Sequence, residues 1–187
     1  MKIRTVQKST WWALAFVLAG GLSLCSPAAQ AQAPAAQDSP EVTKLLKQAR
    51  GQAVQLQRGA DRLESYKHSN LSRQTHASQL NTTKEHVNDL GKTLDQLEAR
   101  QAQASAWQRR AIAEMRPMLE QLAGHTTDAI EHINQNPHQV RHPDYHDTLS
   151  AKSDLSTQLA DLLNDYLAYG EAKANLENAE ARVGSLL

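Results

Sequence analysis

The feature that most constrains this chain is a repeat of apolar residues at helical spacing between Leu80 and Ile133. The repeat consists of Leu80, Val87, Leu90, Leu94, Leu97, Ile112, Met115, Leu119, Leu122, Ala129, Ile130 and Ile133. This spacing puts them on one face of a helix, while charged and amide side chains fill the other face. Because such a face is stabilised by packing on partner helices, the repeat predicts an all-α fold.

Capping residues divide the chain into four predicted helices. Ser39 followed by Pro40 is typical of a helix start, and Ser105 with Gln108 matches a capping box. We therefore expect helices that begin near Ser39, Ser72, Ser105 and Pro143. Short connections between amphipathic helices favour an up-down-up-down four-helix bundle over residues 39–187. The alternative is three helices with a long continuous middle helix, because residues 101–106 contain no helix breaker.

The first 38 residues are not expected to belong to the bundle, and their sequence predicts that the protein is exported. Lys2, Arg4 and Lys8 precede an apolar run over residues 11–24, and Ala29-Gln30-Ala31 follows it. This order is typical of a signal peptide over residues 1–31 that is cleaved after Ala31. Residues 32–38, which are rich in Ala, Gln and Pro, are expected to form a flexible tether. We expect a periplasmic or secreted protein with no stable membrane insertion after cleavage.

A lipoprotein signal, modified on Cys25, is the alternative reading of the same segment. It is disfavoured because Leu24 stands before the cysteine, where a small residue is expected. Cys25 is the sole cysteine of the chain, so the mature protein would contain neither a disulfide nor a thiolate metal ligand. Removal of three basic residues would change the formal net charge from zero to −3. This mildly acidic balance argues against nucleic-acid binding, which favours a basic surface.

Histidines are the chemically most informative residues of the predicted bundle. If the second and third helices turn near Ser105, His76 and His132 lie at the same level. The connection with His138, His142 and His146 then closes over the same end of the bundle. These five residues are the candidate metal ligands, for which zinc or copper would suit imidazole. The simpler interpretation is a set of solvated loop histidines, with His76 as a hydrogen-bonded inward residue.

Two stretches, QLNTTKEHVNDLGK and SAWQRRAIAEMRPMLEQLAGHTTDAIEHIN, resemble a group of uncharacterised exported helical proteins from acidobacterial soil organisms. The resemblance covers about His76 to Asn134, a third of the chain. It implies an exported helical protein and carries no activity, cofactor or site.

The sequence contains no catalytic motif, so we expect no enzyme and no catalytic residues. The predicted function is an exported binding or structural module of the cell envelope with a protein partner of unknown identity. The alternative is a periplasmic metal-binding bundle that uses its histidine-rich end. We also expect Trp107 to mark the turn between the second and third helices and to be partly buried there.

Overall fold

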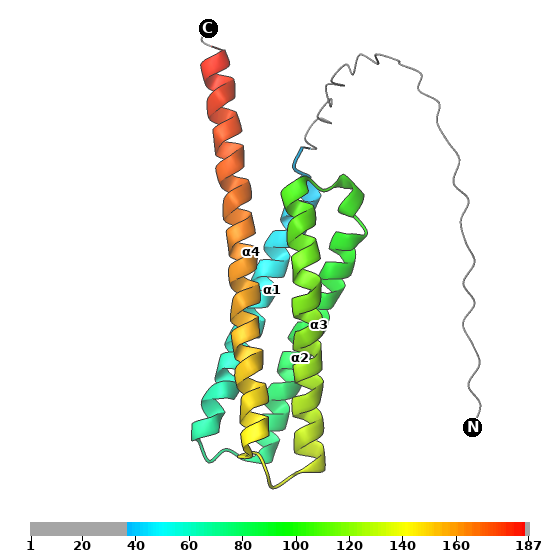
Figure 1. The fold of residues 1–187 in the computed structure, drawn as a ribbon, viewed down its shortest axis with the longest axis vertical. Helices are drawn as coiled ribbons and strands as arrows, with labels where there is room; N and C mark the ends of the chain where they lie inside the picture. The colour runs from blue at the N-terminus through cyan, green and yellow to red at the C-terminus, as the bar shows by residue number, and fades with distance from the viewer. Residues whose placement is uncertain (1–36, 186–187) are drawn as a thin grey trace, which may run out of the picture. The chain divides into compact units, whose positions relative to one another are not determined.

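The computed structural model describes residues 37–185, which form four α-helices and two short 3-10 segments. The α-helices are α1 (Pro40–Ser65), α2 (Arg73–Glu98), α3 (Ala106–Gln135) and α4 (Pro143–Gly184), and the 3-10 segments are Tyr66–His68 and Gln101–Gln103. Successive helices run in opposite directions (Figure 1). The predicted up-down-up-down four-helix bundle is therefore confirmed. The predicted signal peptide and residues 32–36 of the predicted tether lie outside the described residues.

The caps explain where these helices begin. Ser39 and Ser72 accept hydrogen bonds from the amides of Val42 and Thr75, and Pro143 occupies the first turn of α4. At α3, Ser105 forms the predicted capping box with Gln108. Because α2 ends at Glu98 and α3 begins at Ala106, the alternative of one long middle helix is wrong.

Gln108 also joins the start of α3 to the start of α1. Its side-chain carbonyl accepts from the amides of Ser105 at 2.9 Å and Ser39 at 3.1 Å. Its amide nitrogen donates to the carbonyl of Ser39 at 2.9 Å and to the hydroxyl of Thr43 at 2.8 Å. All four bonds are made by a fully buried residue, so they fix the level of α1 against α3.

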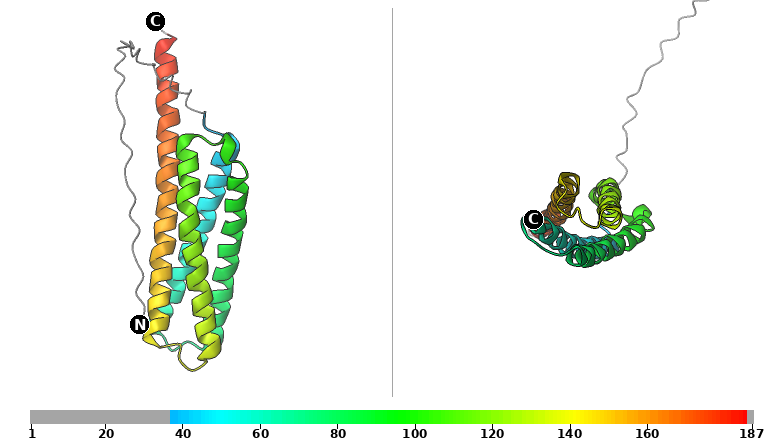
Figure 2. Two further views of the ribbon diagram at one scale, coloured as in Figure 1. Left: turned by 45° about the vertical axis from the view of Figure 1, so that its right-hand side comes forward. Right: turned by 90° about the horizontal axis from the view of Figure 1, so that it is seen from below.

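Each helix packs against two neighbours, so that α1 and α3 both lie between α2 and α4 (Figures 1 and 2). The interior contains two apolar clusters. The larger includes Leu46, Leu90, Ile112 and Leu163, and the smaller surrounds Tyr145. We call the end with Asp38, Trp107 and Gly170 the tryptophan end, and the opposite end, with His76 and the α3–α4 connection, the histidine end.

α4 is longer than its neighbours and continues beyond the tryptophan end of the bundle (Figures 1 and 2). Its 42 residues correspond to about 63 Å of helix, against about 39 Å for the 26 residues of α1. Gly170 is its last buried residue. Within residues 37–185, no helix combines the length and apolar character required to cross a membrane.

Candidate functional site

Trp107 organises the tryptophan end. Its indole is 8% exposed and lies against Gly170 of α4, where an added Cβ would come within 2.5 Å of the ring. The indole N–H donates to the carboxylate of Asp38 at 2.8 Å, and Lys173 donates to the same carboxylate at 3.1 Å. Trp107 lies in the first turn of α3, next to the predicted α2–α3 turn, and it is buried rather than partly buried.

Asp38 is held in place although the sequence assigned it to the tether. Partial burial works to raise the pKa of its carboxyl group, but hydrogen bonds, among them those from Lys173 and Trp107, outweigh burial and lower the pKa. An ionised Asp38 therefore joins the residue before α1 to α3 and α4. The ordered bundle thus extends one residue before the predicted start at Ser39.

A groove of about 840 Å³ runs between α1 and α4 at this end, with Trp107 on its wall. We call it the α1–α4 groove. Leu167, Ala168 and Ala174 of α4 contribute an apolar lining, and α1 contributes three exposed cations. These cations are Lys44, Lys47 and Arg50. Their spacing of three residues gives one row of positive charge on the α1 side of the groove, while the carboxylates of Asp38 and Glu171 also line it. The exposed cations of this row suit an anionic partner with apolar groups.

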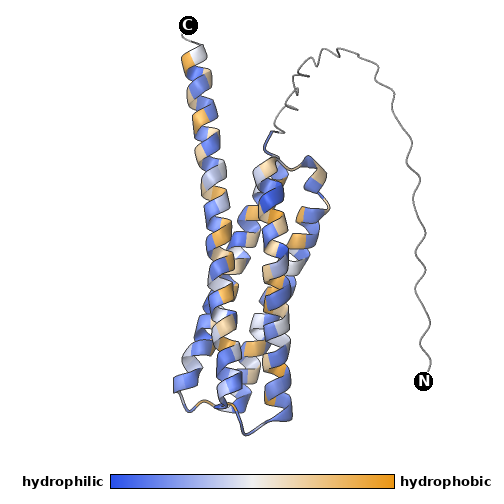
Figure 3. Cartoon of the chain, viewed as in Figure 1, coloured by the Kyte–Doolittle hydropathy of each residue, from blue (hydrophilic) through white to orange (hydrophobic). Residues whose placement is uncertain are grey.

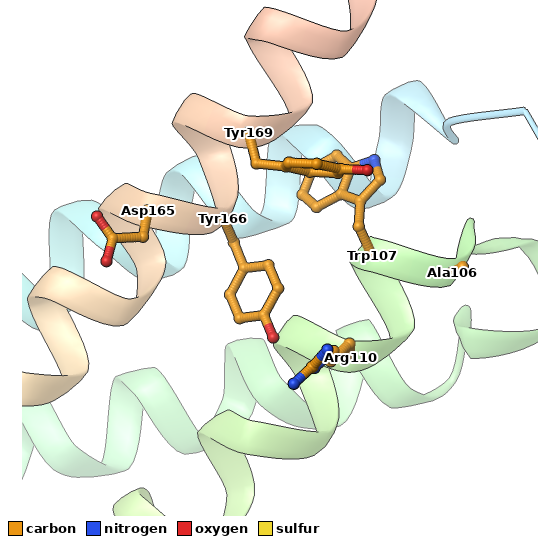
Figure 4. Close-up of a pocket in the computed structure, with 6 residues that line it drawn as sticks. All are labelled: Ala106, Trp107, Arg110, Asp165, Tyr166 and Tyr169. Carbon is orange, nitrogen blue, oxygen red and sulfur yellow. The ribbon is translucent and has the colours of Figure 1, made fainter.

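A second, smaller hollow of about 470 Å³ lies between α3 and α4 on the other side of Trp107 (Figure 4). Tyr166, Tyr169 and Arg110 line it, and the rings of Trp107 and Tyr169 meet edge to face with centroids 6.3 Å apart. Arg110 is engaged by Glu114, whose carboxylate accepts from its Nε at 2.9 Å. This hollow is therefore aromatic rather than strongly cationic.

Lys152 is a buried amine in the middle of the bundle, between the two apolar clusters. Its side chain has no solvent exposure, and its Nζ has no hydrogen-bond partner. The buried hydroxyls of Thr83, Thr126 and Ser156 each donate to a carbonyl four residues earlier in their own helix. Burial in these surroundings lowers the pKa of Lys152 from 10.5 to about 7.

The histidine end is arranged around Tyr145, which has no solvent exposure. Its hydroxyl and the Nδ1 of His76 lie 3.0 Å apart in a hydrogen bond. The ring of His132 stacks on Tyr145 with centroids 5.2 Å apart, and His146 lies on another side at 6.3 Å. Burial lowers the pKa of His76, and the proximity of His146 adds to this effect.

The five predicted metal ligands are only partly brought together. The rings of His132 and His142 lie 5.9 Å apart, but His142 caps α4 by accepting from the amide of Asp144. His76 is buried and bonded to Tyr145, while His138 lies in the exposed connection. Within residues 37–185, no group of three or more His, Cys, Asp or Glu side chains has a geometry suited to a metal ion.

Two features of these sites were not predicted from the sequence. Lys152 follows Leu149 by three residues and precedes Ser156 and Leu159 on the same inward face, so the helical spacing could have identified it. The α1–α4 groove had no such signal, because it is formed by residues more than 100 positions apart.

Comparison of the chain with protein-family models, curated proteins and solved structures yields no match. The resemblance to exported acidobacterial proteins therefore stays a prediction.

Proposed function

We propose that this protein is a non-catalytic binding module of the cell envelope, which docks an acidic segment of a partner protein in the α1–α4 groove. The observation that carries the proposal is the row of Lys44, Lys47 and Arg50 beside an apolar lining. Cations at the rim of a groove attract an acidic partner, and the apolar lining favours a segment that also presents apolar side chains.

Trp107 gives a direct readout of this binding. It lines the groove, and the other two tryptophans, Trp11 and Trp12, lie in the predicted signal peptide. We expect a helical peptide of Glu and Leu to change the Trp107 emission in a saturable titration. A Lys and Leu peptide of equal length should not. The affinity for the acidic peptide should fall with added salt, because exposed charges are screened.

Lys47→Glu should weaken binding of the acidic peptide by about three- to tenfold, because it reverses one charge of the row. Lys84→Glu is the matched control, since Lys84 is an exposed lysine of α2 outside the groove. Equal affinity of the wild type and Lys47→Glu, or equal affinity for both peptides, would exclude the groove as an acidic docking site. If the acidic peptide binds as expected, the partner can be sought by affinity capture from an envelope extract. A protein that the immobilised wild type retains and Lys47→Glu does not would be the partner.

The location in the envelope rests on residues 1–31 and is tested separately. Mass spectrometry of the exported protein should show a chain that begins at Gln32. An intact N-terminus, or a lipid mass on Cys25, would contradict this part of the proposal.

A metal-binding function is the second candidate, and the proximity of the His132 and His142 rings is the observation in its favour. Two neutral imidazoles at this separation are near enough to share one zinc or copper ion after side-chain rotation. Binding would raise the melting temperature of the folded protein, and His132→Ala should abolish the increase. A melting temperature that neither metal changes would remove this candidate. His125→Ala, elsewhere on α3, is the control.

A further inference from the structure

An exposed apolar stripe begins at Tyr169, beside Trp107, and continues along the part of α4 beyond the tryptophan end. Tyr169, Leu176 and Val183 are 57%, 61% and 59% exposed, and they are three of the four exposed large apolar side chains among residues 37–185. They lie seven residues apart, with Ala172 and Ala179 between them. We call these five residues the α4 stripe. Hydrophobic colouring recurs along this part of α4 (Figure 3).

Spacing of alternately three and four residues is the pattern of a two-stranded coiled coil. No residue of α4 after Gly170 is buried. A helical segment of 14 residues with no buried side chain gains little from tertiary packing and is marginal in water, so a partner helix on the stripe would stabilise it. The stripe shares no residue with the α1–α4 groove, so the following inference does not rest on the proposed function.

We propose that the α4 stripe pairs with the α4 stripe of a second copy of this chain, in an antiparallel two-stranded coiled coil. Side-chain size gives the first argument. A register that sets Leu176 against Ala179 of the second copy also sets Ala172 against Val183 of the second copy. Leu176 and Val183 then each meet an alanine, so the two helices can approach closely between residues 172 and 183.

Charge gives the second argument and selects the orientation. In the antiparallel register, Lys173 beside the seam faces Glu180 of the second copy, and two-fold symmetry repeats this pair. Arg182 on the other side of the seam faces the neutral Asn175. A parallel pairing would instead set Glu180 beside Asn175 and lose both opposite-charge pairs.

Lys173 is able to make this additional contact. Its ammonium group already donates to Asp38 at 3.1 Å and pairs with Glu177 at 3.2 Å. An ammonium group has three donors, so one donor is available for Glu180 of the second copy. The antiparallel arrangement also places the two bundles at opposite ends of the paired segments, which avoids a clash between them.

The oligomeric state of the purified protein tests the proposal. Sedimentation equilibrium over roughly 1 to 500 µM should show the mass rising from one chain toward two, because a short apolar seam gives a concentration-dependent dimer. Leu176→Glu should keep the protein monomeric over the same range. Leu71→Glu is the control, since Leu71 is exposed outside the α4 stripe and should leave dimerisation unchanged. A monomeric wild type, or Leu176→Glu that dimerises like the wild type, would overturn the proposal.

Disulfide formation tests the orientation in a Cys25→Ser background. A mixture of Ala172→Cys and Val183→Cys chains should form a crosslinked heterodimer, because these positions face each other in the antiparallel register. Each variant alone should crosslink poorly. Efficient crosslinking of Ala172→Cys with itself would indicate a parallel pair and overturn the proposed arrangement.

Discussion

Replacement of Lys152 by methionine should stabilise the protein. Methionine has nearly the length of lysine and is apolar, so it fills the same space without a buried amine. The wild-type amine has no solvent exposure and no hydrogen-bond partner, and burial lowers its pKa from 10.5 to about 7. Exchange of a buried unpaired charge for an apolar group of similar volume generally stabilises a fold.

The pKa of Lys152 gives the magnitude. A tenfold loss of proton affinity corresponds to about 1.36 kcal/mol, so a decrease from 10.5 to about 7 corresponds to about 5 kcal/mol. The unfolded chain binds the proton more tightly than the folded chain between these two pKa values. Stability of the wild type therefore rises with pH across this window, and the full cost applies below pH 7.

The gain from Lys152→Met should consequently depend on pH. We expect up to about 5 kcal/mol below pH 7, a smaller gain of about 3 kcal/mol at pH 8, and a gain that approaches zero near pH 10.5. Urea unfolding followed by helical circular dichroism, extrapolated to water at each pH, measures this difference.

Lys84→Met is the control, because Lys84 is an exposed lysine of α2. Its free energy of unfolding should stay within about 0.5 kcal/mol of the wild type. If Lys152→Met were destabilising, or if its effect did not change with pH, the amine would have a partner in the folded state. The reasoning from an unpaired buried amine would then be refuted.

Two further substitutions test the packing at the two ends. Gly170→Ala should destabilise by about 1–3 kcal/mol, because its Cβ would overlap the ring of Trp107. Gly124→Ala on α3, where a Cβ meets nothing within 4 Å, should stabilise by up to about 1 kcal/mol. Thermal melts should show a lower melting temperature for Gly170→Ala and a higher one for Gly124→Ala. An unchanged melting temperature of Gly170→Ala would contradict the close contact with Trp107. Tyr145→Phe should cost about 1–2 kcal/mol in urea unfolding, because buried His76 loses its partner, and an unchanged midpoint would contradict that hydrogen bond.

The buried His76 predicts a second pH effect on stability, in a lower pH range than that of Lys152. Its pKa is lowered in the folded state, so the folded chain resists protonation more than the unfolded chain does. This contribution to stability is complete above about pH 6.5 and is lost as the pH falls below that value. Histidine proton NMR should show one ring that titrates below the others. A His76 pKa at or above the ordinary value would contradict the burial.

The fold was predictable because it depends on local signals. Ser105 and Gln108 lie three residues apart and predicted a helix start at this point, and the structure places the capping box there. The apolar spacing on each helix similarly determined which face is buried. Short connections left one simple way to pack four such faces, so the antiparallel bundle followed from the sequence.

The candidate sites were less predictable because they depend on the relative position of helices. The level of His76 against His132 could be estimated by counting from the turn, but the sequence did not show that Tyr145 would enter between them and bond to His76. Likewise, Lys44 and Leu167 are distant in the chain and share a groove only because α1 packs against α4.

The sequence by itself therefore determined the helices, their caps and their inward faces, since these depend on contacts within a few residues. The tertiary structure decided which polar groups are paired. The spacing puts Lys152 on the inward face of α4, but its lowered pKa arises from burial inside the assembled bundle. The tertiary structure also decided how far α4 extends beyond its neighbours. The spacing of the α4 stripe can be seen in the sequence, but its exposure depends on where the neighbouring helices end.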